Sequence, residues 1–328
     1  MVFEFTTSFD FDFITDFSKK YNLTLKDNYI SIPPSMGKGY VRKIEFEPDF
    51  RLLIHKYKLK EDFVIKRNPS TRANDLLSIF FYSNEQPVDL VYNREQPIKF
   101  SQKSGSAIQI TTNDLKSVIR FPANTETQYV VVGITPSKLN SLLAIEKTTG
   151  VLQAITKGSA SFMYFESMNS ETQQILKNIS AINMNDNLSH FLVQIKVQEL
   201  LYHLLYKLSQ RENTSQKAVN NSDIEKLTGV RNIILENISN LPSIHTLAAT
   251  VGMSETKLKL LFKQIYGDTI YNYYQKVRME EAAFLLNHAG ISVSEVGYQL
   301  GFSNLSHFSR LFKRHYGMTP KKYSQQPL

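Results

Sequence analysis

The side chains best suited to bind a charged partner cluster near the C-terminal end of the chain. Between Ser303 and Lys322 the sequence has five basic residues and no acidic one, and the whole chain has a net charge of +8. Guanidinium and ammonium groups pair with phosphate oxygens, so such a cluster attracts polyanions. Because a merely solvated surface usually mixes both signs of charge, this segment predicts a basic binding face.

On a nucleic acid, some of these residues could contact bases and others could contact phosphates. Arg310 has a planar fork of donors that can meet O6 and N7 of one guanine, and such a pair discriminates between bases by ~1 to 3 kcal/mol. Lys313, like Lys263 earlier in the chain, is a flexible point charge late in its predicted helix, which favours a phosphate contact that gives affinity without sequence information. We assign Asn304 to the phosphate contacts as well. Arg310 is therefore expected to specify a base.

The elements that position these residues come from a degenerate internal repeat. Its first copy is SIHTLAATVGMSETKLKLLFKQIYG (243–267) and its second is SVSEVGYQLGFSNLSHFSRLFKRHYG (292–317). Each copy is typical of a short helix, a tight turn and a longer helix, since Gly252 and Gly301 suit the positive φ that follows a helix. The intervening segment 268–290 predicts one helix that sets the two copies at a fixed separation. The repeat therefore predicts two helix-turn-helix motifs.

The longer helix of each copy has an apolar and a polar side. Ser254 is the expected N-cap of the first, and Ser303 or Asn304 that of the second. Helical spacing predicts an inner face made of Leu258, Leu261, Phe262 and Ile265 in the first copy and of Phe308, Leu311, Phe312 and His315 in the second. The side chains left outside are Thr256, Lys257, Lys259, Leu260 and Lys263, and in the second copy Ser306, His307, Ser309, Arg310 and Lys313.

Residues 223–323 resemble the DNA-binding domain of AraC/XylS-type transcriptional regulators, most closely in the stretch EVGYQLGFSNLSHFSRLFKRHYGMTPKKY (295–323). The resemblance implies a seven-helix domain whose two recognition helices enter successive major-groove segments of double-stranded DNA. By alignment with the family, the base contacts would fall on Thr256, Lys259 and Leu260 in the first recognition helix and on Leu305, Ser306, Ser309 and Arg310 in the second.

Three positions depart from the pattern of this family. Leu260 stands where many members have Arg, so it can offer a base only apolar contact. Gly297 stands where most have Ala, and Ser324 where a closing Arg is common. The last two departures concern packing, whereas the first concerns base recognition.

The first 135 residues predict a β-rich region. Short β-branched and aromatic runs, such as 76–83 and 128–135, alternate with turn-forming Asn, Pro, Gly and Asp. An antiparallel barrel or sandwich would close these strands, and the family resemblance implies an effector-binding or dimerisation domain, often a cupin-like barrel. Phenylalanines on odd positions from Phe3 to Phe13 predict a one-faced core strand. Residues 130–146 and the following helices also resemble regulators related to the PchR group.

After Pro136 the hydrophobic period becomes helical. The longest such stretch contains Leu201, Leu205 and Leu208 in an apolar stripe that must be buried. The stripe could pack on the same helix of a second subunit or on the protein's own sheet, and the spacing does not separate these alternatives. We assign the three leucines to dimerisation.

The predicted fold class is α+β, with an N-terminal β-rich domain, either a cupin-like barrel or a sandwich, its following helices, and an all-α double helix-turn-helix domain. The polar segment before Asp223 breaks the helical period and predicts a linker. The domain bounds are 1–213 for the effector-binding or dimerisation domain (β-rich 1–135, helical 136–213), 214–222 for the linker and 223–328 for the DNA-binding domain.

Composition argues against several other classes. The chain has no cysteine, which excludes disulfides, thiolate metal sites and cysteine nucleophiles. Acidic residues near the start and the lack of an apolar run of ~18 residues argue against a signal peptide or a membrane partner, so we expect a cytoplasmic protein. The seven histidines include no His-Glu-x-x-His pattern, and His55 is the single one before His190. We expect no enzyme, no metal site and no cofactor.

These observations predict a sequence-specific DNA-binding transcriptional regulator that responds to a small-molecule effector. The expected partners are double-stranded DNA, an effector whose identity and binding residues are unknown, a second copy of the chain in a homodimer and, for an activator, RNA polymerase. Two alternatives stay open: a DNA-binding protein that acts without a ligand, and a cupin-type enzyme fused to a DNA-binding domain.

Overall fold

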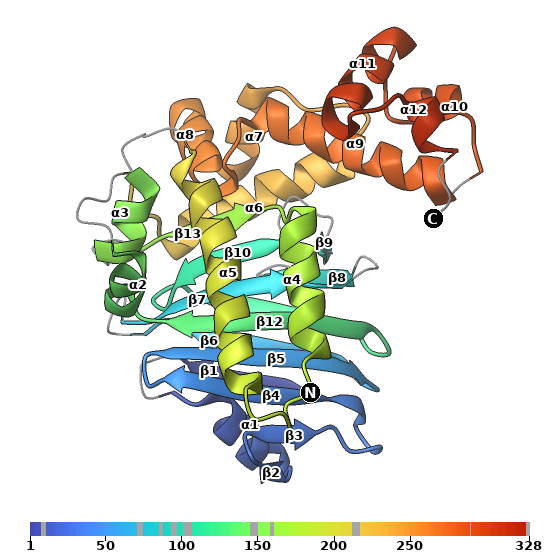
Figure 1. Ribbon diagram of the computed structural model, residues 1–328. Helices are drawn as coiled ribbons and strands as arrows, with labels where there is room; N and C mark the ends of the chain where they lie inside the picture. Colours follow the sequence, from blue (N-terminus) through green and yellow to red (C-terminus); the bar gives the residue numbers. More distant parts are fainter. Residues whose placement is uncertain are drawn as a thin grey trace. The chain divides into compact units, whose positions relative to one another are not determined.

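The computed structural model describes residues 1–7, 11–70, 75–84, 88–92, 97–100, 107–144, 150–157, 161–211, 217–288 and 290–325. The chain divides into two compact units, Met1–Ile224 and Glu225–Leu328 (Figure 1). Within the predicted linker, residues 214–216 lie outside the described residues, 217–220 have no regular structure, and Asn221 begins a helix. The predicted fold class is confirmed, because a β-rich unit with helices precedes an all-α unit.

Two β-sheets make up most of the first unit. Their strand orders are β1-β6-β11-β8-β9 and β13-β10-β7-β12-β5-β4-β3-β2. β1 pairs with β6 in parallel, and the other described pairs are antiparallel. The strands are β1 (Val2–Thr6), β2 (Leu25–Lys26), β3 (Tyr29–Ser31), β4 (Gly37–Glu47), β5 (Phe50–Leu59), β6 (Phe63–Asn68), β7 (Leu77–Tyr82), β8 (Val88–Tyr92), β9 (Pro97–Phe100), β10 (Ile108–Thr112), β11 (Ser117–Phe121), β12 (Glu126–Ile134) and β13 (Met163–Glu166).

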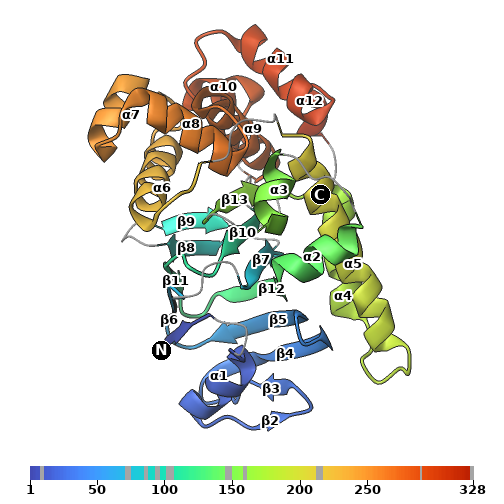
Figure 2. The same cartoon turned by 90° about the vertical axis from the view of Figure 1, so that its left-hand side faces the viewer.

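Helices cover the outer face of the eight-stranded sheet. Figure 1 shows α4 and α5 side by side across its strands, and Figure 2 shows the five-stranded sheet, the eight-stranded sheet and these helices as successive layers. The Thr135 side chain caps α2 by accepting from Lys138 N, and the Asn169 side chain caps α4 by accepting from Thr172 N. The helices of this unit are α1 (Phe13–Tyr21), α2 (Pro136–Leu143), α3 (Gly150–Lys157), α4 (Ser170–Ala181) and α5 (Ser189–Ser209).

A large core of the first unit lies between the eight-stranded sheet and the helices α2, α3, α4 and α5. Alternate residues of the strands, such as Leu52 and Val132, face α5 and pack with its leucines. Leu201, Leu205 and Leu208 are 3%, 4% and 0% exposed, and all three belong to this core. The assignment of these three leucines to a dimer interface is therefore corrected, because the subunit's own sheet already removes them from water.

The opposite side of α5 is also apolar but lies on the surface. Large apolar side chains recur there every three to four residues, so they form one stripe along the helix. The exposed members are Leu188, Phe191, Leu192, Ile195, Tyr202 and Tyr206. No helix among the described residues is both long enough and apolar enough to span a membrane.

The phenylalanine-rich start does not form one continuous strand. β1 ends at Thr6, Phe9 lies outside the described residues, and Phe13 begins α1. The alternation of aromatic and polar residues continues across an element boundary, which periodicity within a short window cannot reveal. Strand β13 likewise interrupts the region predicted as helical. It adds to the eight-stranded sheet as an edge strand by pairing with β10.

Candidate nucleic-acid interface

The second unit contains two helix-turn-helix motifs joined by one long helix. The first motif consists of α7 and α8, the second of α10 and α11, and α9 contacts helices of both. The bounds are α6 (Asn221–Glu236), α7 (Ile244–Val251), α8 (Glu255–Tyr266), α9 (Ile270–His288), α10 (Val293–Gln299), α11 (Leu305–Tyr316) and α12 (Pro320–Tyr323). The two predicted motifs and the helix between them are thus present.

Local capping explains where these helices begin. Ser254 Oγ accepts from Lys257 N at 3.3 Å at the start of α8, and Asn304 Oδ1 accepts from His307 N at 3.1 Å at the start of α11. Ser292 and Glu295 form a reciprocal capping box at the start of α10. Of the two alternatives for α11, Asn304 is therefore the N-cap. Its side-chain oxygen is occupied by this bond, which leaves its amide NH2 group as the donor for a phosphate.

Two buried arginines tie α9 to the rest of the unit. Arg231 of α6 donates to the hydroxyl of Tyr273 at 2.9 Å. Arg278 of α9 donates to the carbonyl oxygen of Leu300 from Nε at 3.0 Å and stacks over the ring of Phe302 at 3.6 Å from its centroid. Both arginines count toward the net charge of +8. Because they are buried, they hold the fold together and are not available to DNA.

The residues predicted for base contact lie on two helices, and most of them are accessible. On α8, Thr256 and Lys259 are exposed and Leu260 is half-buried. On α11, the exposed residues are Ser306 and Arg310 and the half-buried ones are Leu305 and Ser309. Their roles in contacting bases remain predictions.

The predicted phosphate contacts are similarly placed. Asn304 and Lys313 are exposed, and Lys263 is half-buried. Within the described ranges, the side chains of Arg310 and Lys313 have neither a hydrogen bond nor an ion pair with another residue. Lys259, by contrast, lies 3.4 Å from Glu255. The outward cations of α11 therefore have no internal partner to compete with a phosphate or a base.

The inner faces of the recognition helices match the predicted spacing except at one end. Phe262 and Phe312 are both completely buried at equivalent positions. His315 was expected to point inward, but it is exposed. The last turn of α11 therefore presents Lys313, Arg314 and His315 together. Partial burial lowers the pKa of His315, so its imidazole is neutral near pH 7 and the positive charge of this turn comes from Lys313 and Arg314.

Leu305 and Gly297 are in close contact inside the second motif. A Cβ built on Gly297 would lie 2.6 Å from Cδ2 of Leu305 and 3.2 Å from Cδ1 of Phe308. The absence of a side chain at Gly297 therefore lets Leu305 pack against α10. This packing explains why Leu305 is half-buried, and it limits how far Leu305 can reach toward a base.

Sequence reasoning missed a cavity in the first unit, whose lining includes Arg51, His55 and Arg67. A detectable signal was present, since Arg51 stands in an apolar strand run where a charge is unexpected. His55 was weighed only as a metal ligand. Among the described residues, no group of three or more His, Asp or Glu side chains could hold a metal ion.

Comparisons with known proteins agree with the double motif. A family model described as "Helix-turn-helix domain" matches residues 247–326. The chain is 35% identical over 82 residues to the probable transcription factor PqrA of Proteus vulgaris, which covers 25% of this chain and 67% of that protein. It is 30% identical over 128 residues to the HTH-type transcriptional activator RhaS of Salmonella schwarzengrund, with 39% of this chain and 45% of that protein covered.

A solved transcriptional regulator from Chromobacterium violaceum, described as AraC-type DNA-binding domain-containing, is 32% identical, with 33% of this chain and 100% of that chain covered and a TM-score of 0.31. The match to RhaS, described above, spans less than half of the length of RhaS. The resemblance found in the sequence is confirmed by the family model and by the relatives together. This chain belongs to the AraC/XylS family of helix-turn-helix transcriptional regulators.

Proposed function

We propose that this protein regulates transcription by binding a specific double-stranded DNA sequence with α8 and α11. The observation that carries this proposal is the pair of outward helices, each capped at its N-terminus and each braced against α9. Two recognition helices on one connecting helix should read segments about one helical turn apart, ~10 bp centre to centre. Arg310 and Lys313 then supply a base contact and a phosphate contact from one helix.

Selection from random duplexes with the full chain tests this proposal. We expect an enriched motif with two blocks separated by ~10 bp. A motif with one short block would argue against the use of both helices, and the absence of any enriched motif would contradict sequence-specific binding. Arg310→Ala is the informative variant, and Lys56→Gln, which removes an exposed charge on β5 in the first unit, is the matched control.

We further propose that residues 1–213 bind a small-molecule effector, that 214–222 act as a linker and that 223–328 bind DNA. The cavity of the first unit supports the effector role. A ligand that binds the folded unit raises its apparent stability, so a thermal-shift screen of metabolites on the full chain is the direct test. For an activator, RNA polymerase would be the further partner, and the site of action is the cytoplasm.

The proposed homodimer would use the exposed stripe of α5 in place of the buried leucines. The stripe from Leu188 to Tyr206 spans ~27 Å at 1.5 Å per residue, and large apolar side chains in such a row mark an interaction site. Two copies of one stripe can pair with each other about a two-fold axis. Phe191→Glu with Ile195→Glu should give a folded monomer by light scattering. Leu201→Glu with Leu205→Glu should instead unfold the first unit, because both leucines are buried. A folded dimer in the first variant would contradict this interface.

A further inference from the structure

The cavity of the first unit lies between its two sheets. On β5, Arg51, Leu53 and His55 face the cavity, whereas the alternate residues Leu52 and Ile54 face the helices. The volume of the cavity, taken as the space open to the centres of water-sized spheres, is about 70 Å³, which is several times the room that one water needs. The cavity is thus separate from the core that α5 covers.

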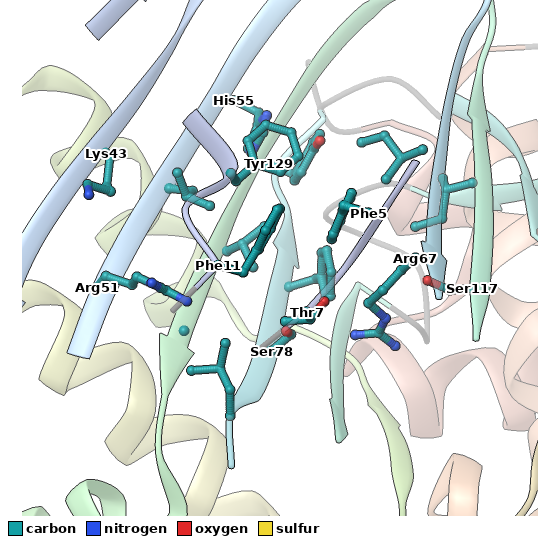
Figure 3. A pocket seen from close by; sticks show the side chains of 18 of the residues that line it. Phe5, Thr7, Phe11, Lys43, Arg51, His55, Arg67, Ser78, Ser117 and Tyr129 are labelled. Carbon is teal, nitrogen blue, oxygen red and sulfur yellow. The ribbon is translucent and has the colours of Figure 1, made fainter. Parts of the chain in front are cut away.

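Aromatic rings form much of its wall. Phe5 and Phe11 stack on each other with centroids 4.6 Å apart and planes 4° apart, and Figure 3 shows them between Arg51 and Arg67. His55 stacks on Tyr129 at 4.3 Å. Burial lowers the pKa of His55 to about 3, so the imidazole is neutral near pH 7. An apolar ligand body could therefore lie against these rings without facing a charge there.

Arg51 stands at one side of this apolar space, beside Gly133 of the neighbouring strand. It pairs in the strand register with Gly133 of β12, and Gly133 pairs with Ser78 of β7. A Cβ on Gly133 would lie 3.2 Å from both Cγ and Nε of Arg51. The missing side chain at Gly133 therefore provides the room in which the Arg51 side chain lies across the sheet.

The guanidinium of Arg51 has unused donors. The neighbouring carboxylates of Asp12 and Glu45 each lie 2.9 Å from Nζ of Lys43, so both are paired with that lysine. In the described part of the chain, Arg51 itself has neither a hydrogen bond nor an ion pair within 4.0 Å. Burial lowers the pKa of Arg51, yet a guanidinium stays protonated. A half-buried cation of this kind is stabilised most by an anion that enters the cavity.

Arg67 differs from Arg51 in this respect. It is 3% exposed, and its Nη2 donates to Thr111 Oγ1 at 3.4 Å. Arg67 is thus part of the wall between β6 and β10. A bidentate contact from one guanidinium suits a carboxylate, whereas a sugar would need polar groups spread around the whole cavity.

We propose that this cavity binds a small organic acid, with its carboxylate on Arg51 and its apolar body between Phe11 and the His55–Tyr129 pair. The inference rests on the proposed effector role of the first unit and adds the chemical class of the ligand. Aromatic and aliphatic acids share this chemistry, so the probes include one of each. Arg51, in the room that Gly133 leaves, forms the end of the site that holds the carboxylate of the ligand.

Calorimetric titration of the full chain tests the proposal with four probes: 3-phenylpropanoate, octanoate, the neutral 3-phenylpropanamide and glucose. We expect at least one carboxylate to bind the wild type, and the amide to bind roughly tenfold to a hundredfold more weakly, as the loss of a charged hydrogen bond implies. Arg51→Gln should remove this preference for the acid over the amide, while Lys56→Gln should keep it. Arg51 has neither a hydrogen bond nor an ion pair with any residue that the structure describes, so this variant should fold, which a thermal unfolding curve checks.

Gly133→Val provides a second measurement. The added side chain would enter the space beside Arg51. It should therefore weaken binding of the acids, while the unfolding temperature stays close to that of the wild type. Equal binding of acid and amide by the wild type would overturn the proposal, as would an unchanged preference in Arg51→Gln or no binding of either acid. Binding of glucose alone would overturn the ligand class and leave the effector role in place. Operator selection uses no ligand, so its failure would be seen separately.

Discussion

The two helix-turn-helix motifs have the same elements but use them differently. α8 buries six of its side chains, including Phe262, Ile265 and Tyr266, and its outer surface carries Glu255 beside Lys259. α11 buries Phe308 and Phe312, and its outward Arg310 and Lys313 have neither a hydrogen bond nor an ion pair among the described residues. The first recognition helix therefore buries more of its side chains, and we expect the second to contribute more to contact with an anionic partner. Two copies of one sequence pattern need not contribute equally to DNA recognition.

The turn glycines should show the largest difference between the motifs. Gly301 and Gly252 both have positive φ, 78° and 62°. A Cβ on Gly301 would overlap the carbonyl oxygen of Ser239, whereas the atom nearest to a Cβ on Gly252 is Nζ of Lys226 at 3.9 Å. Gly252→Ala should lower the free energy of unfolding by about 1 to 2 kcal/mol, and Gly301→Ala by on the order of 3 kcal/mol or more. Denaturant unfolding with hydrogen exchange of the second unit measures both. Equal losses would show that Ser239 moves aside easily.

The second largest difference between the motifs should be in how strongly each discriminates between bases. Arg310→Ala should reduce the preference for one operator base pair by ~1 to 3 kcal/mol, because a planar fork of donors is lost. Leu260→Ala removes only an apolar contact and should change discrimination less. Binding of the full chain to every single-base variant of the selected operator measures this difference. Equal or reversed losses would contradict the division of labour between α8 and α11.

The affinity for DNA of any sequence should change by less than the base discrimination does. Lys313→Ala should weaken binding to all duplexes alike and make the logarithmic salt slope shallower by ~0.9, because one phosphate contact releases about one counterion. Titrations at several salt concentrations give the slope, with Lys56→Gln as the control that removes a distant charge. A loss confined to one operator sequence would mean that Lys313 reads a base.

Gly297→Ala should have the smallest effect. The equivalent residue of the first motif is Ala248, which is buried, so the fold accepts a methyl group at that place. In the second motif the new Cβ would displace Cδ2 of Leu305, which is the movable end of a side chain. A gain in helix propensity of about 1 kcal/mol offsets this shift, so stability should change by less than ~1 kcal/mol. A loss as large as that of Gly301→Ala would show that Leu305 has no alternative position.

The local elements of both units followed well from sequence. Runs such as 76–83 and 128–135 became strands β7 and β12, and Ser254 became the predicted N-cap of α8. These features depend on residues within one turn or one strand, where periodicity and capping act directly. The prediction failed where an alternating pattern crossed an element boundary, as at Phe13, which begins α1.

The chain's sequence by itself determined the repeat, the two motifs, their caps and the outward position of Arg310. Only the tertiary structure decided which cations are buried, which face of α5 is covered and which side chains enclose the cavity. Arg278 is buried because Leu300 and Phe302, far along the chain, receive it. Arg51 lies beside Gly133 because the pairing of β5 with β12 joins segments more than 80 residues apart. Such contacts depend on which helices and strands pack against each other. The spacing of residues within one helix or strand does not indicate its packing partner.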